Sequence, residues 1–313
     1  MNKEDDIRLD QKVRAAWMYY IAGLNQSEIA SQLGTSRPVV QRLIAAAKDE
    51  GIVSIGLHHP VANCLDYAQL LKEKYQLTDS NIMPVYSIES TLDSVTFGCY
   101  QLMARYLQGD KPTIVGIGSG LTLKKTIKRI DFDSQNTRCV ALISAMNEHG
   151  QCNYYDDVPL LLARKIQGKY YQWPAPRYAQ SREEYQMWST NRLFRNVSTV
   201  ARDSDVIFVG IGALGRQSPI FKDGFIDEQQ LEELTARGGV GEILGRFIDA
   251  EGNVVESQIN QMITSHDIRE SNCPRIAAAC GEDKRPAILA ALKGGWINGL
   301  VTDEHTARWL LTR

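Results

Sequence analysis

The residues whose types and spacing best suit a chemical task lie between positions 26 and 51. Cationic side chains there can pair with phosphates, and small hydroxyl or amide side chains can hydrogen-bond to the edges of bases. The residues expected to contact DNA are Gln26, Ser27, Thr35, Ser36, Arg37, Gln41, Arg42 and Lys48. Five cations and one acid lie between residues 11 and 48, a local net charge of +4, whereas the whole chain carries −2. This local excess of positive charge favours a confined nucleic-acid-binding surface.

The hydrophobic pattern around these residues predicts two short helices separated by a turn at Gly34, because glycine is the residue type that most often ends a helix. Ser36 is placed to cap the second helix, and Pro38 is tolerated in its first turn, where backbone amides have no helical partner. The residues expected on buried faces are Ile29, Ala30 and Leu33 in the first helix and Val40, Leu43, Ile44 and Ala47 in the second. This arrangement is typical of a helix-turn-helix.

A third helix before this pair is expected to cover it and complete a three-helix DNA-binding unit. The residues expected on its inner side are Val13, Ala16, Trp17 and Tyr20. Residues 52–57 alternate like a short strand, and the His-His-Pro sequence that follows is typical of a hinge. We therefore expect one domain over residues 1–58 and a second over residues 59–313. A generic three-helix stretch with a glycine turn is the alternative interpretation of the first segment.

Beyond residue 60, apolar runs alternate with helical patterns, which indicates an α/β domain with a parallel sheet between layers of helices. Strands are expected near residues 81–86, 113–117, 139–143, 170–173, 206–211, 276–280 and 297–301. Helices are expected near residues 65–75, 89–108, 121–130, 157–167, 183–195, 227–237, 284–293 and 303–311. Residues 245–255 are expected to form a hairpin that turns at residues 250–253.

Open α/β sheets bind ligands at the carboxyl ends of their strands, so the loops that follow the strands are the place to search. Three such loops, residues 116–122, 210–215 and 281–284, are rich in glycine or polar residues. The first would present free backbone amides and the hydroxyls of Ser119 and Thr122 to an anion or a sugar oxygen. Each loop taken alone is also compatible with a simple tight turn. No complete dinucleotide-binding or P-loop motif is present, so we expect no dinucleotide cofactor and no NTPase activity.

Composition excludes several other classes of protein. A chain of 313 residues with 43% hydrophobic content can bury a substantial core and is long for a single domain. Six cysteines and five histidines lack the spacing of a metal site, so no structural metal is expected, and Cys99, Cys139 and Cys280 are expected to be buried thiols. No apolar run approaches the roughly 20 residues of a membrane span, and no signal peptide is recognisable. A cytoplasmic protein is expected.

Several motifs together resemble those of the SorC family of sugar-sensing transcriptional regulators, also described as SorC/DeoR-type. After the helix-turn-helix they are, in order, residues 116–123, 173–176, 205–212, 239–249 and 298–303. The resemblance covers nearly the whole chain. It implies a Rossmann-like effector-binding domain similar to sugar-phosphate isomerases and deaminases, an operon controlled by its own sugar or polyol, and a homo-oligomer, either a tetramer or a dimer.

The resemblance also implies an effector pocket made by the loop residues that match the family's motifs. These residues are Gly118, Ser119, Gly120, Thr122, Gly241, Glu242 and Lys284. The chain departs from the family over residues 144–150, where Asn147 and His149 become possible contacts, and over residues 258–266, so the effector is expected to be unusual. Cations in the loops are few, namely Lys284, Arg216 and Arg246, which favours a neutral sugar or polyol over a phosphosugar.

Two functions from different classes remain open. The first is a DNA-binding regulator of a carbohydrate or polyol catabolic operon that is not an enzyme and responds to a sugar, polyol or sugar phosphate. The alternative is an isomerase or deaminase with an accessory N-terminal domain, for which acids and bases are available. The candidates are Glu242, Asp249, Glu282 and His149. A DNA-binding module has little use in a metabolic enzyme, so we favour the regulator.

Overall fold

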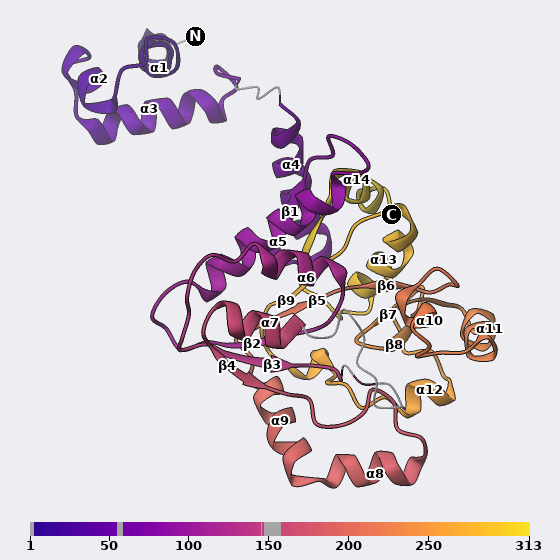
Figure 1. Ribbon diagram of the computed structural model, residues 1–313. Coiled ribbons are helices and arrows are strands. Elements are labelled where there is room, and N and C mark those ends of the chain that lie inside the picture. The colour runs from indigo at the N-terminus through magenta and orange to yellow at the C-terminus, as the bar shows by residue number, and fades with distance from the viewer. Residues whose placement is uncertain (1–2, 55–58, 145, 147–157) are drawn as a thin grey trace. The chain divides into compact units, whose positions relative to one another are not determined.

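The computed structural model of the protein describes residues 3–54, 59–144, 146 and 158–313 (Figure 1). The chain divides into two compact units, Met1–His59 and Pro60–Arg313. Each unit has a hydrophobic core of its own. Asn147 and His149, the two possible ligand contacts of the divergent segment, lie outside the described residues. Cys152 lies outside them as well.

The smaller unit contains three helices. They are α1 (Lys3–Tyr20), α2 (Gln26–Gln32) and α3 (Arg37–Asp49). The buried residues of α2 and α3 are Ile29, Ala30, Val40, Ile44 and Ala47, with Leu33 and Leu43 packed at the margin. Gly34, with a φ of 61°, ends α2 in the left-handed conformation that glycine adopts without strain. These observations confirm the predicted helix-turn-helix.

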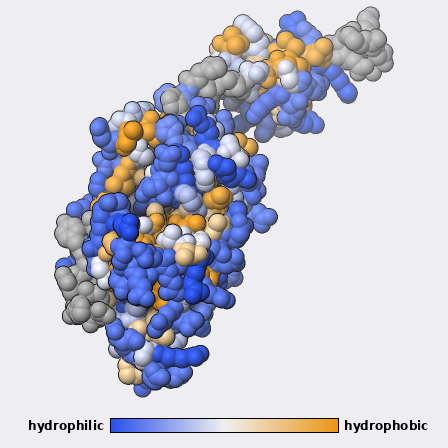
Figure 2. Space-filling model, turned by 90° about the vertical axis from the view of Figure 1, so that its right-hand side faces the viewer, coloured by the Kyte–Doolittle hydropathy of each residue, from blue (hydrophilic) through white to orange (hydrophobic). Residues whose placement is uncertain are grey.

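Helix α1 packs only partly as predicted. Ala15 and Ala16 are buried, Tyr20 is half-buried, and Val13 and Trp17 are 43% and 57% exposed. Small alanine side chains let α1 pack close to its neighbours, and this places the bulkier side chains on the outer face. Hydrophobic residues are accordingly visible on the surface of the smaller unit (Figure 2).

The two ends of α3 differ in detail from the expectation. Ser36 is the N-cap residue, but its side chain makes no capping hydrogen bond. Residues 52–54 form bends and do not begin a strand, while residues 55–58 are outside the described part of the chain. The backbone N–H of Val53 donates to the carbonyl of Ala47 at 3.1 Å, so this segment folds back on the end of α3 and does not extend away from it.

A parallel sheet of seven strands forms the centre of the larger unit, in the order β1-β10-β9-β5-β2-β3-β4 (Figure 1). Its strands are β1 (Asp79–Met83), β2 (Ile114–Ile117), β3 (Arg138–Ala141), β4 (Lys169–Tyr171), β5 (Val206–Val209), β9 (Arg275–Ala278) and β10 (Gly299–Asp303). Ile207 and Val209 of β5 belong to one hydrophobic cluster, and Val206 and Phe208 belong to another. Both faces of the sheet are therefore buried, as predicted.

Helices connect the strands and supply the two outer layers. They are α4 (Pro60–Tyr75), α5 (Thr91–Leu107), α6 (Leu121–Lys128), α7 (Val158–Lys165), α8 (Arg182–Thr190), α9 (Arg192–Arg202), α10 (Pro219–Lys222), α11 (Glu228–Ala236), α12 (Gln258–Gln261), α13 (Arg285–Lys293) and α14 (Glu304–Leu311), with 3-10 turns η1 (Ile268–Glu270) and η2 (Glu282–Lys284). The single helix expected over residues 183–195 is interrupted at Asn191, whose side chain accepts a hydrogen bond from the Leu193 N–H at 2.8 Å and caps α9. None of the described helices is long and apolar enough to cross a membrane.

A second, three-stranded antiparallel sheet consists of β6 (Gly212–Ala213), β7 (Gly239–Ile243) and β8 (Arg246–Asp249). The hairpin between β7 and β8 turns at Leu244 and Gly245, which both have positive φ. Two positive-φ residues suit a tight hairpin. The segment after β8 contributes an isolated bridge, between Ile248 and Val254. The chain therefore also turns at residues 250–253, as expected. The Val255 N–H donates to the Phe247 carbonyl at 3.0 Å, and the Asp249 side chain accepts hydrogen bonds from the Glu251 and Asn253 N–H groups of this turn.

Asn25 should be important for the start of α2. Its side chain accepts hydrogen bonds from the Ser27 and Glu28 N–H groups, and the Glu28 carboxylate accepts one from the Asn25 N–H at 2.7 Å. We expect Asn25→Ala to destabilise α2 by about 0.5–2 kcal/mol. Native-state hydrogen exchange over residues 26–32 measures the effect. Asn191→Ala, which removes a cap in the larger unit, is the control, and equal protection of α2 in Asn25→Ala and the native chain would contradict the prediction.

Candidate functional site

A cavity of about 520 Å³ lies where the loops after several strands meet. All three loops predicted from the sequence contribute to its lining. Their contributions are Ser119, Gly120 and Thr122 from the first loop, Gly210, Gly212 and Gly215 from the second, and Lys284 from the third. Leu92, Ile143, Arg177, Phe225, Glu242 and Leu244 are among the other lining residues. The cavity therefore combines an apolar wall with charged and hydroxyl groups, the mixture typical of a small-molecule site.

The loop after β2 brings the start of α6 to the cavity. Gly120 has a φ of 117°, a conformation that side-chain-bearing residues rarely adopt, and none of the described side chains caps the first turn of α6. Backbone N–H groups in such a first turn have no helical partner and can donate to an anion or a sugar oxygen. Gly118 does not line the cavity. Its N–H donates to the Phe208 carbonyl at 2.9 Å, and a Cβ there would lie 3.0 Å from Leu244.

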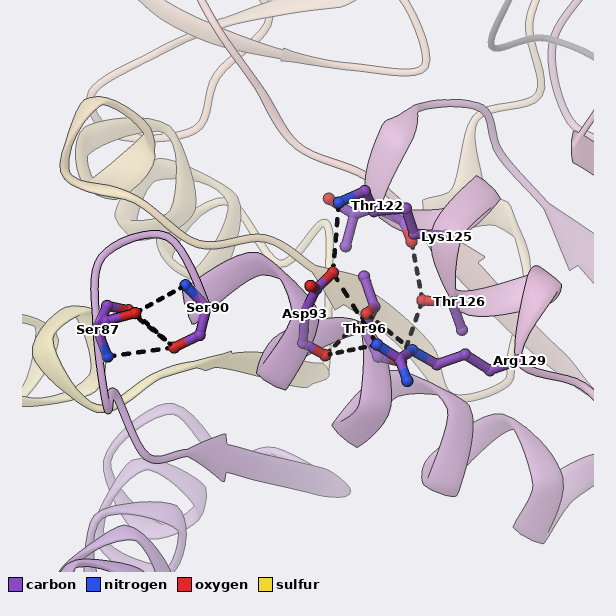
Figure 3. A network of polar contacts seen from close by, with 8 residues as sticks. All are labelled: Ser87, Ser90, Asp93, Thr96, Thr122, Lys125, Thr126 and Arg129. Carbon is purple, nitrogen blue, oxygen red and sulfur yellow. Dashed lines mark hydrogen bonds and ion pairs between the residues drawn. The ribbon is translucent and has the colours of Figure 1, made fainter.

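A polar network fixes the first turn of α6 against α5 (Figure 3). The Asp93 carboxylate pairs with Lys125 at 3.3 Å, and the Thr126 hydroxyl donates to the Thr122 carbonyl at 2.8 Å. Arg129 donates from Nε to the Thr96 hydroxyl at 3.2 Å. Thr96 and Thr126 are fully buried, so the bond of the Thr126 hydroxyl is shielded from water, whereas the pair of Asp93 with Lys125 is exposed. The network holds Thr122 in place at the cavity wall.

Glu242 on β7 presents a half-buried carboxylate to the cavity. Its Oε2 accepts a hydrogen bond from the Gly245 N–H at 2.7 Å, across the tight turn between β7 and β8. Burial raises the pKa of the Glu242 carboxyl, while the bond from Gly245 and the positive charges of Arg177 and Lys284 act in the opposite direction. A carboxylate in this position can accept hydrogen bonds from ligand hydroxyls.

Arg177 is the main cavity residue that sequence reasoning missed. It is buried, its guanidinium lies 3.7 Å from the centre of the Phe225 ring, and its Nε and Nη2 donate to the Ser144 carbonyl at 3.4 and 3.3 Å. It follows the Trp173–Pro176 motif in a segment without regular secondary structure, so no periodicity marked it. The nearby motif could have marked Arg177 as a candidate. An arginine next to a buried segment is itself expected to be buried, and buried arginines are almost always paired.

Other predicted residues have different positions. Gly241 does not line the cavity and instead allows β7 to pack directly on Ala287 of α13. Arg216 pairs with Glu228, and Arg246 donates to Ser265 and to the His266 carbonyl, so neither cation lines the cavity. Of the described cysteines four are buried, and Cys280, predicted to be buried, is half-buried at the cavity wall. No group of His, Cys, Asp or Glu suited to a metal ion occurs within the described ranges.

Helix α3 presents the polar surface of the smaller unit. Ser36, Arg37, Gln41, Arg42 and Lys48 are exposed, as is Ser27 on α2, whereas Gln26 and Thr35 are half-buried. Arg37 Nε donates to the Gln26 side chain at 3.4 Å, which orients the guanidinium at the start of α3.

Two cations counted in the local charge have acidic partners outside the counted segment. Lys12 pairs with Glu50 at 2.5 Å, and Arg14 pairs with Asp10 at 2.6 Å. The positive surface is therefore narrower than the sequence count suggests, and three cations of α3 carry it. They are Arg37, Arg42 and Lys48.

The chain resembles known proteins over both of its units. Residues 59–312 match the family model described as "Putative sugar-binding domain". The chain is 30% identical to the erythritol catabolism regulatory protein EryD of Brucella abortus, over 96% of this chain and 95% of that protein. It is 31% identical to the transcriptional regulator LsrR of Escherichia coli K12, over 96% and 94%. The crystal structure of the full-length sorbitol operon regulator SorC from Klebsiella pneumoniae superposes with a TM-score of 0.72, 26% identity and coverage of 98% and 99%.

A helix-turn-helix unit joined to a sugar-binding domain defines a DNA-binding transcriptional regulator. The relatives share this organisation over almost their whole length. The chain belongs to the SorC family of such regulators.

Gly241 should matter for packing and not for ligand contact. A methyl group there would lie 2.3 Å from the Ala287 Cβ and 2.6 Å from the Gly212 carbonyl oxygen, so the backbone would have to move. We expect Gly241→Ala to lower the free energy of unfolding by about 1–3 kcal/mol, measured by urea denaturation. Gly210→Ala is the matched control, because its nearest neighbour would be the Ser119 carbonyl oxygen at 3.3 Å. Equal stability of the two variants would refute this role.

Proposed function

We propose that this regulator binds operator DNA through α3 and that a hydroxyl-rich ligand in the cavity controls that binding. One observation carries the proposal: the start of α6, the half-buried Glu242 carboxylate and the cations Arg177 and Lys284 all line one cavity in a chain with a helix-turn-helix. The residues proposed to contact the ligand are Ser119, Gly120, Thr122, Arg177, Glu242 and Lys284. Gly118 and Gly241 support them through backbone packing.

The ligand is proposed to be a polyol or sugar that carries an anionic group, best a phosphate ester. The expectation of a neutral ligand depended on a low number of cations in the loops. Arg177 adds a second cation to Lys284, and the first turn of α6 adds donors, which together suit a phosphate. Glu242 would accept hydrogen bonds from the hydroxyls at the other end of the molecule. The names of the relatives EryD and SorC refer to the polyols erythritol and sorbitol, which supports a polyol skeleton.

On the DNA side, we propose that Arg37, Gln41 and Arg42 contact the major groove, while Lys48 contacts phosphate. Helix-turn-helix proteins bind paired half-sites about one helical turn apart, near 34 Å, which requires two copies of the smaller unit. A homo-oligomer, either a tetramer or a dimer, is therefore part of the proposal, as is a cytoplasmic location, where DNA and catabolites meet.

An isomerase or deaminase activity is the less favoured alternative. Such chemistry needs an acid or base that is free to exchange a proton with the substrate. Glu242 is the best placed carboxylate, yet one of its oxygens already accepts the Gly245 N–H. The relatives are named as transcriptional regulators. The test is whether the purified chain converts a sugar phosphate and whether Glu242→Gln abolishes that activity. Both results together would establish an enzyme and overturn the proposal that the cavity serves only to control DNA binding.

The ligand class is tested by thermal unfolding with erythritol, sorbitol, the monophosphate of each and inorganic phosphate. A ligand present at 100 times its Kd stabilises the native state by about 2.7 kcal/mol, so a phosphorylated polyol should raise Tm most. Lys284→Gln should weaken its binding by about 1.5–3 kcal/mol and affect a neutral polyol much less. Lys293→Gln, on the neighbouring helix α13 but paired with Glu251, is the control. A larger shift with the neutral polyol than with its phosphate would reject the anionic ligand.

The DNA surface is tested by selecting operator fragments from genomic DNA and measuring their affinity for α3 variants. Arg42→Ala and Arg37→Ala should each cost about 1–3 kcal/mol on the selected sequence and less on random duplex if they contact bases. Arg14→Ala is the control, because Arg14 pairs with Asp10 on α1. An equal loss on all sequences would assign the residue to phosphate contact, and no loss would exclude it from the interface.

A further inference from the structure

Two consecutive acids, Asp303 and Glu304, stand at the carboxyl end of β10. Strand β10 lies between β9 and β1, so these acids are flanked by the loops that follow both neighbouring strands. Asp303 Oδ2 accepts a hydrogen bond from the Gly281 N–H at 3.3 Å, on the β9 side. Glu304 Oε1 accepts one from the Val85 N–H at 3.2 Å, on the β1 side. These two consecutive residues therefore hold both loops through hydrogen bonds.

Both loops lead directly to the cavity. Gly281 is followed by Asp283 and Lys284, which line the cavity. Val85 precedes α5, whose residue Leu92 lines the cavity from another side. Lys284 and Leu92 thus belong to the two segments whose backbone N–H groups are bound by Asp303 and Glu304. A ligand that contacts either residue contacts one of these segments.

The second oxygen of Glu304 contacts a different element. The Cys64 thiol on α4 donates to Glu304 Oε2 at 3.8 Å, within the range for sulfur. Burial, with a smaller effect of the Glu304 charge, raises the pKa of Cys64 to about 11, so the thiol keeps the proton that it donates. Helix α4 is the first element of the larger unit, and the link from the DNA-binding unit leads into it.

Asp303 is anchored independently of these contacts. Its carboxylate accepts hydrogen bonds from the N–H and the hydroxyl of Thr306, at 2.9 and 2.7 Å, and so caps α14. Asp303 thus joins the Gly281 loop to the start of α14, where Glu304 lies. The two oxygens of Glu304 face different elements, one the loop after β1 and the other α4, so a movement of Glu304 reaches both.

We propose that Glu304 is a positioning residue that couples occupancy of the cavity to α4 and thereby to the DNA-binding unit; this rests on the proposed function. A ligand shifts an equilibrium only by binding its two states with different affinity. In this proposal the bond between Glu304 and Cys64 is present in only one of the two states of the protein. The contacts of α4 therefore differ between the two states. Removing that bond leaves the cavity and α3 intact but disconnects their responses.

Glu304→Gln and Cys64→Ala test the coupling in the full chain. Glutamine retains one oxygen for the Val85 N–H but offers the thiol no second acceptor, and Cys64→Ala removes the thiol donor alone. Glu73→Gln, an exposed residue on the same helix α4, is the control. Operator affinity is measured with and without erythritol, sorbitol and the monophosphate of each, and the compound with the largest effect on the native chain is used for comparison.

The expected result is a change of about 5- to 150-fold in operator affinity for the native chain and for Glu73→Gln, the usual range for coupled sites. In Glu304→Gln and Cys64→Ala the ratio of operator affinities with and without ligand should fall towards one, while the ligand still raises Tm. If Glu304→Gln fails to fold, Cys64→Ala carries the test.

Other outcomes separate the two proposals. A native chain that responds to none of the four compounds refutes ligand control itself, and the coupling with it. A native chain that responds normally, together with a Cys64→Ala variant that keeps the full ratio, refutes the coupling through α4 while the proposed function stands. A loss of ligand binding in either variant would also refute it, because Glu304 would then be part of the cavity's construction.

Discussion

The common direction of the seven strands is the constraint on which the site depends. Because all of them are parallel, the loops that follow them emerge at one edge, and residues far apart in sequence meet there. Ser119 follows β2, Gly210 follows β5 and Lys284 follows β9, yet all three line one cavity. The second, antiparallel sheet closes this edge by bringing in Glu242 from β7. The chemistry of the cavity is thus a product of strand direction and of a single tight turn at Leu244 and Gly245.

The charges of Glu242 and Arg177 at this edge are tolerated because both groups have defined partners. The Glu242 carboxylate receives the Gly245 N–H, and Arg177 lies against an aromatic ring while donating to the Ser144 carbonyl. Burying a charge without such partners is costly, so these contacts allow the cavity to hold opposite charges close together in a largely apolar wall. The cavity is therefore preorganised for a ligand with both hydroxyl and anionic groups, and little rearrangement is required of its polar side chains.

Features that depend on local periodicity could be predicted from the sequence, whereas features that depend on packing between distant segments could not. The helix-turn-helix and all seven parallel strands could be predicted, because each depends on a repeating pattern of apolar residues or on a glycine. The predicted face of α1 was right for Ala16 and Tyr20 but wrong for Val13 and Trp17, because periodicity cannot tell which of two adjoining apolar sides packs. Arg177 and the packing role of Gly241 depend on Phe225 and Ala287, which are distant in sequence. The periodicity of a single segment does not report such contacts.

The unusual placement of Trp17 has a spectroscopic consequence. It is the smaller unit's only tryptophan and is 57% exposed, whereas Trp173 and Trp296 in the larger unit are 2% and 1% exposed, and Trp188 and Trp309 are half-buried. A water-soluble quencher such as acrylamide will reach the indole of Trp17 and spare the two enclosed ones. With phenylalanine in place of the two half-buried tryptophans, intrinsic fluorescence can therefore follow the two halves of the chain separately without an attached dye.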